Sequence, residues 1–158
     1  KQVFFSLTLC LLIAKVFAQT KVVIPTASDK PNRYQQEQID RKYGMFIHFG
    51  INTFHDQEWT DGSKPASSYP PTTIDAKQWV STAKAVGMKY IILVSKHHDG
   101  FCLWDSKYTD YDVANSAYKT NVVEVLAKEC RKQGIRLGLY YSLWDRKQNG
   151  DLNDRKAD

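Results

Sequence analysis

Three short apolar runs constrain the fold of this chain more than any other feature of its sequence. They cover residues 44–50, 90–96 and 135–142, and longer stretches of mixed sequence separate them. Strands of a parallel sheet are covered on both faces, so they typically carry continuous apolar residues rather than an alternating pattern. We therefore interpret the three runs as buried, parallel β-strands.

The segments between these runs have the spacing of amphipathic helices. Residues 75–86 and 122–133 repeat apolar side chains every three or four positions, and each segment is followed by a glycine that can end a helix, Gly87 or Gly134. Asn121 is suited to cap the start of the second helix. The order of strand, helix, strand, helix and strand predicts an α/β fold with right-handed crossovers.

Two architectures share this order, an open doubly wound sheet and a (β/α)8 barrel. A dinucleotide-binding sheet would place a short glycine-rich turn after the first strand, whereas residues 51–74 form a long loop rich in aromatic and charged residues. The loop favours the barrel. Because a barrel needs roughly 250 residues, we expect only its N-terminal part here, an incomplete barrel with three of the eight strands. We expect Ile47, Leu93 and Leu139 to point into its interior.

The N-terminal part of the chain is expected to be processed. Residues 1–18 have the pattern of a secretory signal peptide, with an apolar run too short to span a membrane and Ala18 at the expected cleavage site. Residues 19–40 form a polar lead-in that leads to a short helix near residues 35–43, and residues 41–158 form the barrel portion. The mature protein is therefore expected to be exported, periplasmic or extracellular (lysosomal in an animal), without a membrane anchor.

Charge argues against nucleic-acid binding, and the positions of the cysteines bear on whether the protein contains a disulfide. The net charge of +5 falls to +3 when Lys1 and Lys15 leave with the signal peptide, which is too weak to indicate nucleic-acid binding. Cys102 follows a predicted strand and Cys130 lies in a predicted helix. An exported location permits a disulfide between them, yet we expect two half-buried thiols.

Polar and aromatic side chains stand at the end of each predicted strand. In parallel α/β folds the carboxyl ends of the strands face the functional site. His48 ends the first strand, His97 and His98 follow the second, and Tyr140 and Tyr141 lie near the end of the third. If strand geometry continued through the histidine pair, its two rings would point to opposite faces, so one of them could be structural.

The residue types at this rim favour a polyhydroxylated ligand. Imidazole, tyrosine and carboxylate groups bond to hydroxyls, and an indole such as that of Trp59 stacks on the apolar side of a sugar ring. A metal site is disfavoured, because adjacent histidines cannot easily chelate one ion and the usual spacing of zinc ligands is lacking. The sequence shows neither a serine nucleophile elbow nor a phosphate-binding loop.

Four segments together resemble the α-L-fucosidases of glycoside hydrolase family 29. They are residues 43–50 (YGMFIHFG), Glu58-Trp59, residues 96–104 (KHHDGFCLW) and residues 138–142 (GLYYS). The resemblance implies a retaining glycosidase that hydrolyses terminal α-L-fucosyl linkages in two displacement steps, with no cofactor and no metal. The first loop is similar to that of the branch acting on α-1,3/1,4-fucosides in branched glycans.

The resemblance also implies roles for individual residues. Tyr140 would lie near the reacting centre, with Tyr141 as an alternative, and the catalytic Asp and Glu are expected after Asp158, so Asp145 is assigned neither role. The substrate would be a fucosylated oligosaccharide or glycoconjugate. Six residues would contact it: His48, Glu58, Trp59, His97, His98 and Tyr140.

Two other functions stay open at this point. The strand-end residues alone would also suit another retaining (β/α)8 glycosidase, or a sugar-binding protein without catalytic activity. The sequence does not define an oligomeric state.

Overall fold

The computed structural model describes residues 28–149. The expected signal peptide, its cleavage site and the first part of the polar lead-in lie outside the described residues. The chain divides into two compact units, Lys1–Arg33 and Tyr34–Asp158, and the second unit contains the sheet and the helices that pack on it. Within the described residues, no helix is both long and apolar enough to cross a membrane.

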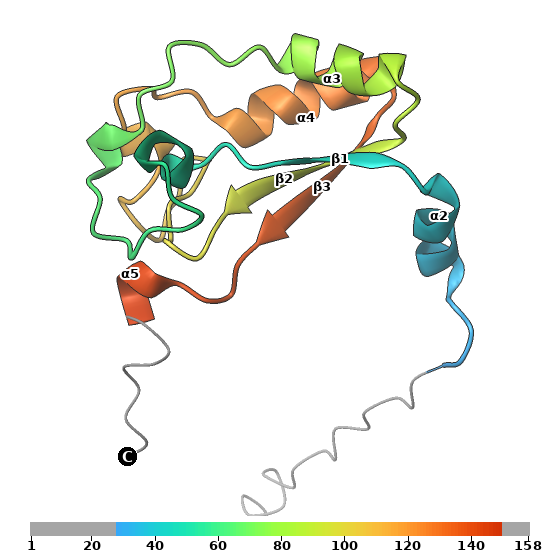
Figure 1. Ribbon diagram of the computed structural model, residues 1–158, viewed down its shortest axis with the longest axis horizontal. Coiled ribbons are helices and arrows are strands. Elements are labelled where there is room, and N and C mark those ends of the chain that lie inside the picture. The colour runs from blue at the N-terminus through green and yellow to red at the C-terminus, as the bar shows by residue number, and fades with distance from the viewer. Residues whose placement is uncertain (1–27, 150–158) are drawn as a thin grey trace, which may run out of the picture. The chain divides into compact units, whose positions relative to one another are not determined.

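The second unit is built on a three-stranded sheet. Strands β1 (Gly44–Ile47), β2 (Tyr90–Lys96) and β3 (Arg136–Tyr141) lie in the order β1-β2-β3, and both pairs are parallel (Figure 1). This confirms the three predicted strands and the α/β class. β1 is shorter than expected, because the chain leaves the sheet before His48 and enters a 3-10 helix, η1 (Ile51–His55).

Both predicted crossover helices are present, and they pack side by side on one face of the sheet (Figure 1). In α3 (Ala76–Ala85) the Asp75 carboxylate caps the helix by accepting a hydrogen bond from the backbone N–H of Gln78, at 2.8 Å. Asn121 caps α4 (Val122–Gln133) as predicted, accepting from the backbone N–H of Glu124 at 3.0 Å. Gly134 ends α4 in the left-handed conformation, with φ of 73°, which explains the glycine there.

The remaining elements are short. Helix α2 (Arg33–Arg41) is exposed and begins two residues before the helix expected near residues 35–43. Helix α5 (Arg146–Asn149) follows β3 and was not predicted, nor were the 3-10 helices η1, η2 (Ala66–Ser68) and η3 (Val113–Asn115). Such single turns carry too few residues to show a periodic pattern.

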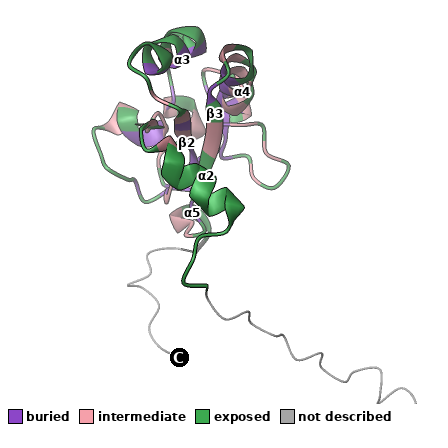
Figure 2. Ribbon diagram, turned by 90° about the vertical axis from the view of Figure 1, so that its right-hand side faces the viewer, coloured by how far each residue is buried: buried purple, intermediate pink, exposed green. Residues whose placement is uncertain are grey.

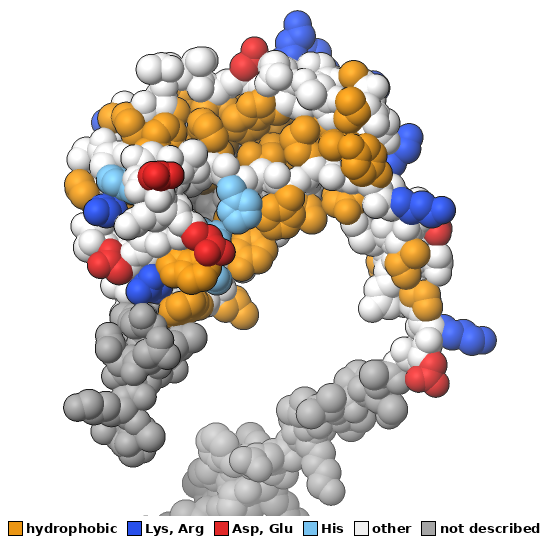
Figure 3. Space-filling model, in the orientation of Figure 1, with side chains coloured by type: hydrophobic (Ala, Val, Ile, Leu, Met, Phe, Trp, Pro, Cys, Tyr) orange, Lys and Arg blue, Asp and Glu red, His pale blue; other side chains and the backbone are white. Residues whose placement is uncertain are grey.

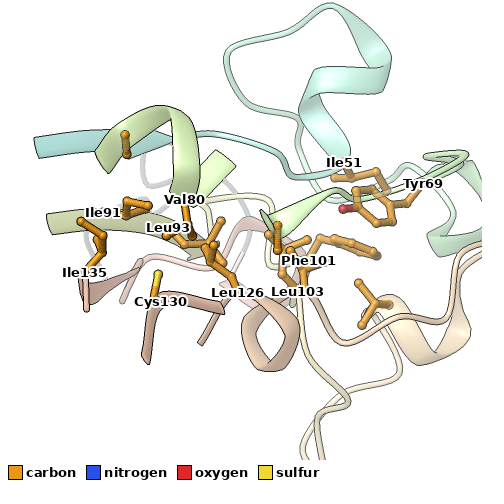
Figure 4. Packing of buried hydrophobic residues seen from close by; sticks show 14 of the residues in the cluster. Ile51, Tyr69, Val80, Ile91, Leu93, Phe101, Leu103, Leu126, Cys130 and Ile135 are labelled. Atoms are coloured by element: carbon orange, nitrogen blue, oxygen red, sulfur yellow. The ribbon is translucent and has the colours of Figure 1, made fainter. Parts of the chain in front are cut away.

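The core lies between the sheet and the two helices. The inner sides of α3 and α4 are buried while their outer sides are exposed (Figure 2). Leu93 of β2 packs between Val80 of α3 and Leu126 of α4, and all three side chains are fully buried (Figure 4). The same cluster continues beneath the loops at the carboxyl end of the sheet, where it includes Tyr69 and Phe101.

The expected orientation of one layer of strand residues was wrong. Ile47, Leu93 and Leu139 are paired across the sheet, and Leu93 faces the helices with none of its surface exposed. Since side chains alternate along a strand, the opposite face carries the neighbouring layer, which includes Phe46 and Ile92. The strands were predicted correctly, but their sequences did not indicate which of the two alternating layers faces the helices.

Strands β2 and β3 do not keep one register along their whole length. Val94 pairs with Tyr140 but Lys96 pairs with Tyr141, so Ser95 is an extra residue in β2, as in a β-bulge. Its hydroxyl donates to the backbone oxygen of Tyr140 at 2.9 Å. The bulge lies directly before Lys96, and Lys96 directly precedes His97 and His98. A bulge bends its strand, so the direction of β2 changes just before the candidate site.

Cys102 and Cys130 are free thiols, as expected, but both are buried rather than half-buried. Burial raises the pKa of Cys102 to about 12 and that of Cys130 to about 11. Both thiols are therefore protonated at ordinary pH and serve as part of the core.

Candidate functional site

A cavity of about 250 Å³ lies at the carboxyl ends of β1 and β2. His48, directly after β1, and His97, directly after β2, contribute side chains to its lining. The loop between β1 and α3 supplies most of the rest. The complete lining is His48, Gly50, Asn52, Thr53, Gln57, Glu58, Val94 and His97.

The tips of all three strands converge beside this cavity. The ring centres of His48 and His97 are 5.5 Å apart, and the ring of Tyr140 from β3 lies 6.2 Å from that of His97. Figure 3 shows pale-blue histidine side chains on this side of the molecule, among orange apolar side chains and next to red carboxylates. The convergence expected of the strand-end residues is thus confirmed, whereas their roles in binding stay predictions.

The structure distinguishes the two adjacent tyrosines. Tyr140 lies beside His97 and, at 6.2 Å, beside Phe46 on the face of the sheet away from the helices. The ring of Tyr141 instead lies 4.8 Å from the ammonium of Lys96 and 6.2 Å from Trp104. Tyr140 is therefore the tyrosine on the side of the candidate site.

The two adjacent histidines do not point to opposite faces. β2 ends at Lys96, so strand alternation no longer applies to them, and their ring centres are only 4.4 Å apart. Both contact Trp59, which is stacked on His97 at 6.4 Å and lies edge-on to His98 at 5.7 Å. His98 is not part of the cavity lining but is placed beside it by His97 and Trp59.

The loop that carries Glu58 and Trp59 is held by the buried side chain of Asn52. Its amide nitrogen donates to the backbone oxygen of Glu58 at 3.0 Å, across one turn of the loop. This bond fixes Glu58 at the cavity, while Trp59 remains 39% exposed next to the histidine pair. A carboxylate and an indole are thus presented to the same rim.

His97 is electrostatically suited to remain neutral. Burial, followed by the neighbouring rings of His98 and His48, lowers the pKa of His97 to about 4. Within the described residues its buried Nδ1 atom has no hydrogen-bond partner. A neutral imidazole offers one donor and one acceptor, which matches a ligand hydroxyl better than it matches an anion.

The other acidic side chains near the strand ends are occupied by structural contacts. Asp99 is buried, its Oδ1 accepts a hydrogen bond from the backbone N–H of Phe101 at 2.7 Å, and burial raises its pKa. Asp145 forms an ion pair with Lys96 at 3.0 Å. Of the carboxylates in the described residues, only Glu58 lines the cavity, and no group of three or more His, Cys, Asp or Glu there could hold a metal ion.

Sequence reasoning missed three polar residues that line the cavity, Asn52, Thr53 and Gln57. They lie in the loop between His48 and Glu58, so their position between two expected ligand contacts was the available signal. The ion pair between Lys96 and Asp145 was also missed, although both residues adjoin predicted strand ends. The pairing joins the segments that follow β2 and β3, and no pattern in the sequence indicated it.

Comparison with known proteins places this arrangement in a family. The sequence profile of the α-L-fucosidase family matches residues 61–158. The chain belongs to the α-L-fucosidase family. The chain is 45% identical to α-L-fucosidase 1 of Arabidopsis thaliana over 78% of its own length and 24% of that protein, and 32% identical to the human plasma α-L-fucosidase over 66% of its own length and 28% of that protein. It thus spans about a quarter of the length of these curated relatives.

Solved structures show the same relationship. A glycoside hydrolase 29 family member from a rumen bacterium superimposes with a TM-score of 0.69 at 40% identity, and the match covers 73% of this chain and 21% of that protein. A family 29 α-L-fucosidase of Bacteroides thetaiotaomicron, trapped as a covalent intermediate in complex with 2-fluoro-fucosyl fluoride, gives a TM-score of 0.69 at 31% identity. The match covers 87% of this chain and 36% of the Bacteroides protein.

Proposed function

We propose that the protein is a retaining α-L-fucosidase, and that the described chain forms the wall that holds the hydroxyl groups of the fucose ring. The observation that carries this proposal is the cavity between the tips of β1 and β2, lined by His48 and His97 in a chain of this family. His97 is neutral above a pH of about 4, so it can both donate to and accept from a hydroxyl. Glu58, Trp59, His98 and Tyr140 complete the proposed binding wall.

We further propose that residues 41–158 form the N-terminal portion of a (β/α)8 barrel, and that the three strands are its first three. Three observations support this: the strands are all parallel, the crossover helices cover only one face, and the cavity lies at the carboxyl ends of the strands. The face that carries Phe46 would then be the barrel interior.

The proposed reaction is a double displacement. An Asp carboxylate attacks the anomeric carbon, a fucosyl-enzyme forms, and water releases fucose while a Glu serves first as acid and then as base. Both carboxylates are expected after Asp158, by resemblance to the family. The histidines of this chain would hold the ring hydroxyls more tightly as the ring flattens toward the transition state, without a cofactor. The fucosyl intermediate trapped in the Bacteroides relative supports a retaining course.

The substrate is proposed to be a fucosylated oligosaccharide or glycoconjugate, with preference for α-1,3/1,4 linkages. Export after removal of residues 1–18 would bring the enzyme to such glycans in the periplasm, outside the cell or in a lysosome. Sequencing the N-terminus of the secreted protein tests this, and a mature chain that begins anywhere other than Gln19 would contradict the expected cleavage site.

The function is tested by replacing His48 in the complete protein as its gene encodes it. His48→Ala should lower kcat/KM on an aryl α-L-fucoside by on the order of 10²-fold, because hydrogen bonds that tighten in the transition state are lost. His55→Ala is the matched control, since His55 belongs to the same loop but does not line the cavity.

Each result has a distinct meaning. Unchanged activity in His48→Ala would contradict the proposed binding wall. A wild-type protein that prefers another aryl glycoside would be a glycosidase of different specificity, and one that binds fucose without turnover would be a sugar-binding protein.

A further inference from the structure

Ser142, the residue after β3, makes two short hydrogen bonds through one hydroxyl group. Its Oγ lies 2.7 Å from Nδ1 of His98 and 2.7 Å from the backbone oxygen of Trp144. A carbonyl oxygen can only accept, so the single hydroxyl proton of Ser142 is donated to Trp144. The bond to His98 must then be donated by the ring, which carries its proton on Nδ1.

This proton count fixes the chemistry of the opposite ring nitrogen. In a neutral imidazole only one nitrogen bears a proton, so Nε2 of His98 has a free lone pair and acts as an acceptor. The ring is held between Trp144, at 4.8 Å, and Trp59, at 5.7 Å, with His97 at 4.4 Å. An acceptor in the proposed binding wall is suited to accept a hydrogen bond from a hydroxyl group of the ligand.

Ser142 is itself held by a buried cation. The backbone N–H of Ser142 donates to the backbone oxygen of Lys96 at 3.0 Å, and the Lys96 ammonium donates to the backbone oxygen of Ser142 at 3.1 Å. The same ammonium pairs with Asp145 at 3.0 Å, and Lys96 is only 4% exposed. The backbone N–H of Arg146 donates to the backbone oxygen of His98 at 2.7 Å, which closes a second link between the ends of β2 and β3.

We propose that Ser142 is a positioning residue that holds neutral His98 in the Nδ1-protonated tautomer, so that Nε2 accepts a hydrogen bond from a hydroxyl group of the fucose ring. The Lys96–Asp145 ion pair keeps Ser142 in place. The inference rests on the proposed function for the identity of the ligand, but the tautomer itself is a property of the protein without substrate.

The chain contains a matched control for this arrangement. Ser68 donates to the backbone oxygen of Pro65 at 2.7 Å and lies 2.8 Å from Nε2 of His55, so the same proton count applies. Neither Ser68 nor His55 lines the cavity. Ser68→Ala therefore removes the same kind of hydroxyl from the same kind of histidine without touching the proposed binding wall.

The first experiment uses kinetics of the complete protein on an aryl α-L-fucoside. Ser142→Ala should lower kcat/KM by roughly tenfold to a hundredfold, because the His98 ring is no longer held in one tautomer. Ser68→Ala should change kcat/KM by less than about threefold. In a His98→Gln background, Ser142→Ala should add less than about twofold, because a residue that acts through His98 has nothing left to position. A full additional loss in that background would overturn the proposal.

The second experiment needs no substrate, and its main result comes from the wild-type protein. The ¹⁵N chemical shifts of the His98 ring, identified by the signals that disappear in His98→Gln, should show Nδ1 protonated and Nε2 unprotonated at neutral pH. Where Ser142→Ala folds, these signals should move toward a mixture of tautomers. A wild-type ring protonated at Nε2 overturns the proposal. A protein with the expected tautomer but no release of fucose would overturn the proposed function alone.

Discussion

The face of the sheet covered by α3 and α4 buries Leu93 completely, whereas the opposite face leaves 51% of Phe46 exposed. The same three strands build both faces, and the alternation of side chains along each strand separates them. The covered face holds the local core, and the open face leads at its carboxyl end to the rings of His48, His97 and Tyr140. Stability and the candidate site are thus supplied by opposite sides of one sheet.

The largest effect should come from leaving the open face without cover. We expect residues 19–158, expressed alone, neither to melt cooperatively nor to release fucose from an aryl α-L-fucoside. Phe46 is more than half exposed on this face, and β1 and β3 are both edge strands in the described sheet, which invites association. Calorimetry beside the complete protein measures this, and a soluble monomer with a sharp transition would show that the covered face suffices.

A second prediction compares the two faces within the complete protein. Leu93→Ala should lower the free energy of unfolding by about 2–5 kcal/mol, the usual cost of a cavity in a packed core. Phe46→Ala should cost about 3–5 kcal/mol as well, provided that a barrel interior encloses the open face.

Denaturant unfolding measures both costs, with Tyr108→Ala as the control because Tyr108 is 97% exposed. If Phe46→Ala costs as little as Tyr108→Ala, Phe46 is exposed in the complete protein too, which would contradict the proposed barrel.

The smallest effect concerns the titration of His97 at the open face. Its pKa is lowered to about 4, so between about pH 6.5 and pH 4 the unfolded chain binds a proton that the folded chain does not. The folded state therefore loses stability as the pH falls through this range, and His97→Gln should lose less. Unfolding curves of both proteins at pH 7 and pH 4.5 measure the difference, and parallel losses would show that His97 is not the group responsible.

The sequence was sufficient for the three strands and the two crossover helices, but not for the short helices or for the alignment of the strands. β2 and α4 occupy the predicted residues, because their signals are strong and local. β2 is a continuous apolar run, and α4 combines helical spacing of apolar residues with an N-cap and a terminating glycine. His48 and His97 were expected at one edge because parallel strands deliver their ends to it, and both line the cavity; their role in binding stays a prediction.

What the sequence could not give depends on contacts between distant segments. The layer containing Leu93 was assigned to the wrong face, since all positions of β2 from Tyr90 to Val94 are apolar or aromatic and no alternation marks the inside. The pairing of Lys96 with Asp145 joins residues far apart in the chain and follows from the three-dimensional course of β2 and β3.

The extra residue Ser95 in β2 has a consequence for how this region can change during evolution. Deleting it would restore regular pairing with β3 and leave Lys96 opposite Tyr141, but it would remove the hydroxyl that donates to the backbone oxygen of Tyr140 and shorten by one residue the chain that leads to His97 and His98. Substitutions here alter one contact at a time, but a single-codon deletion would rearrange the whole segment at once. We therefore expect homologous sequences to align without a gap through residues 94–98, and a relative that lacks one residue there to place the two histidines differently in the proposed binding wall.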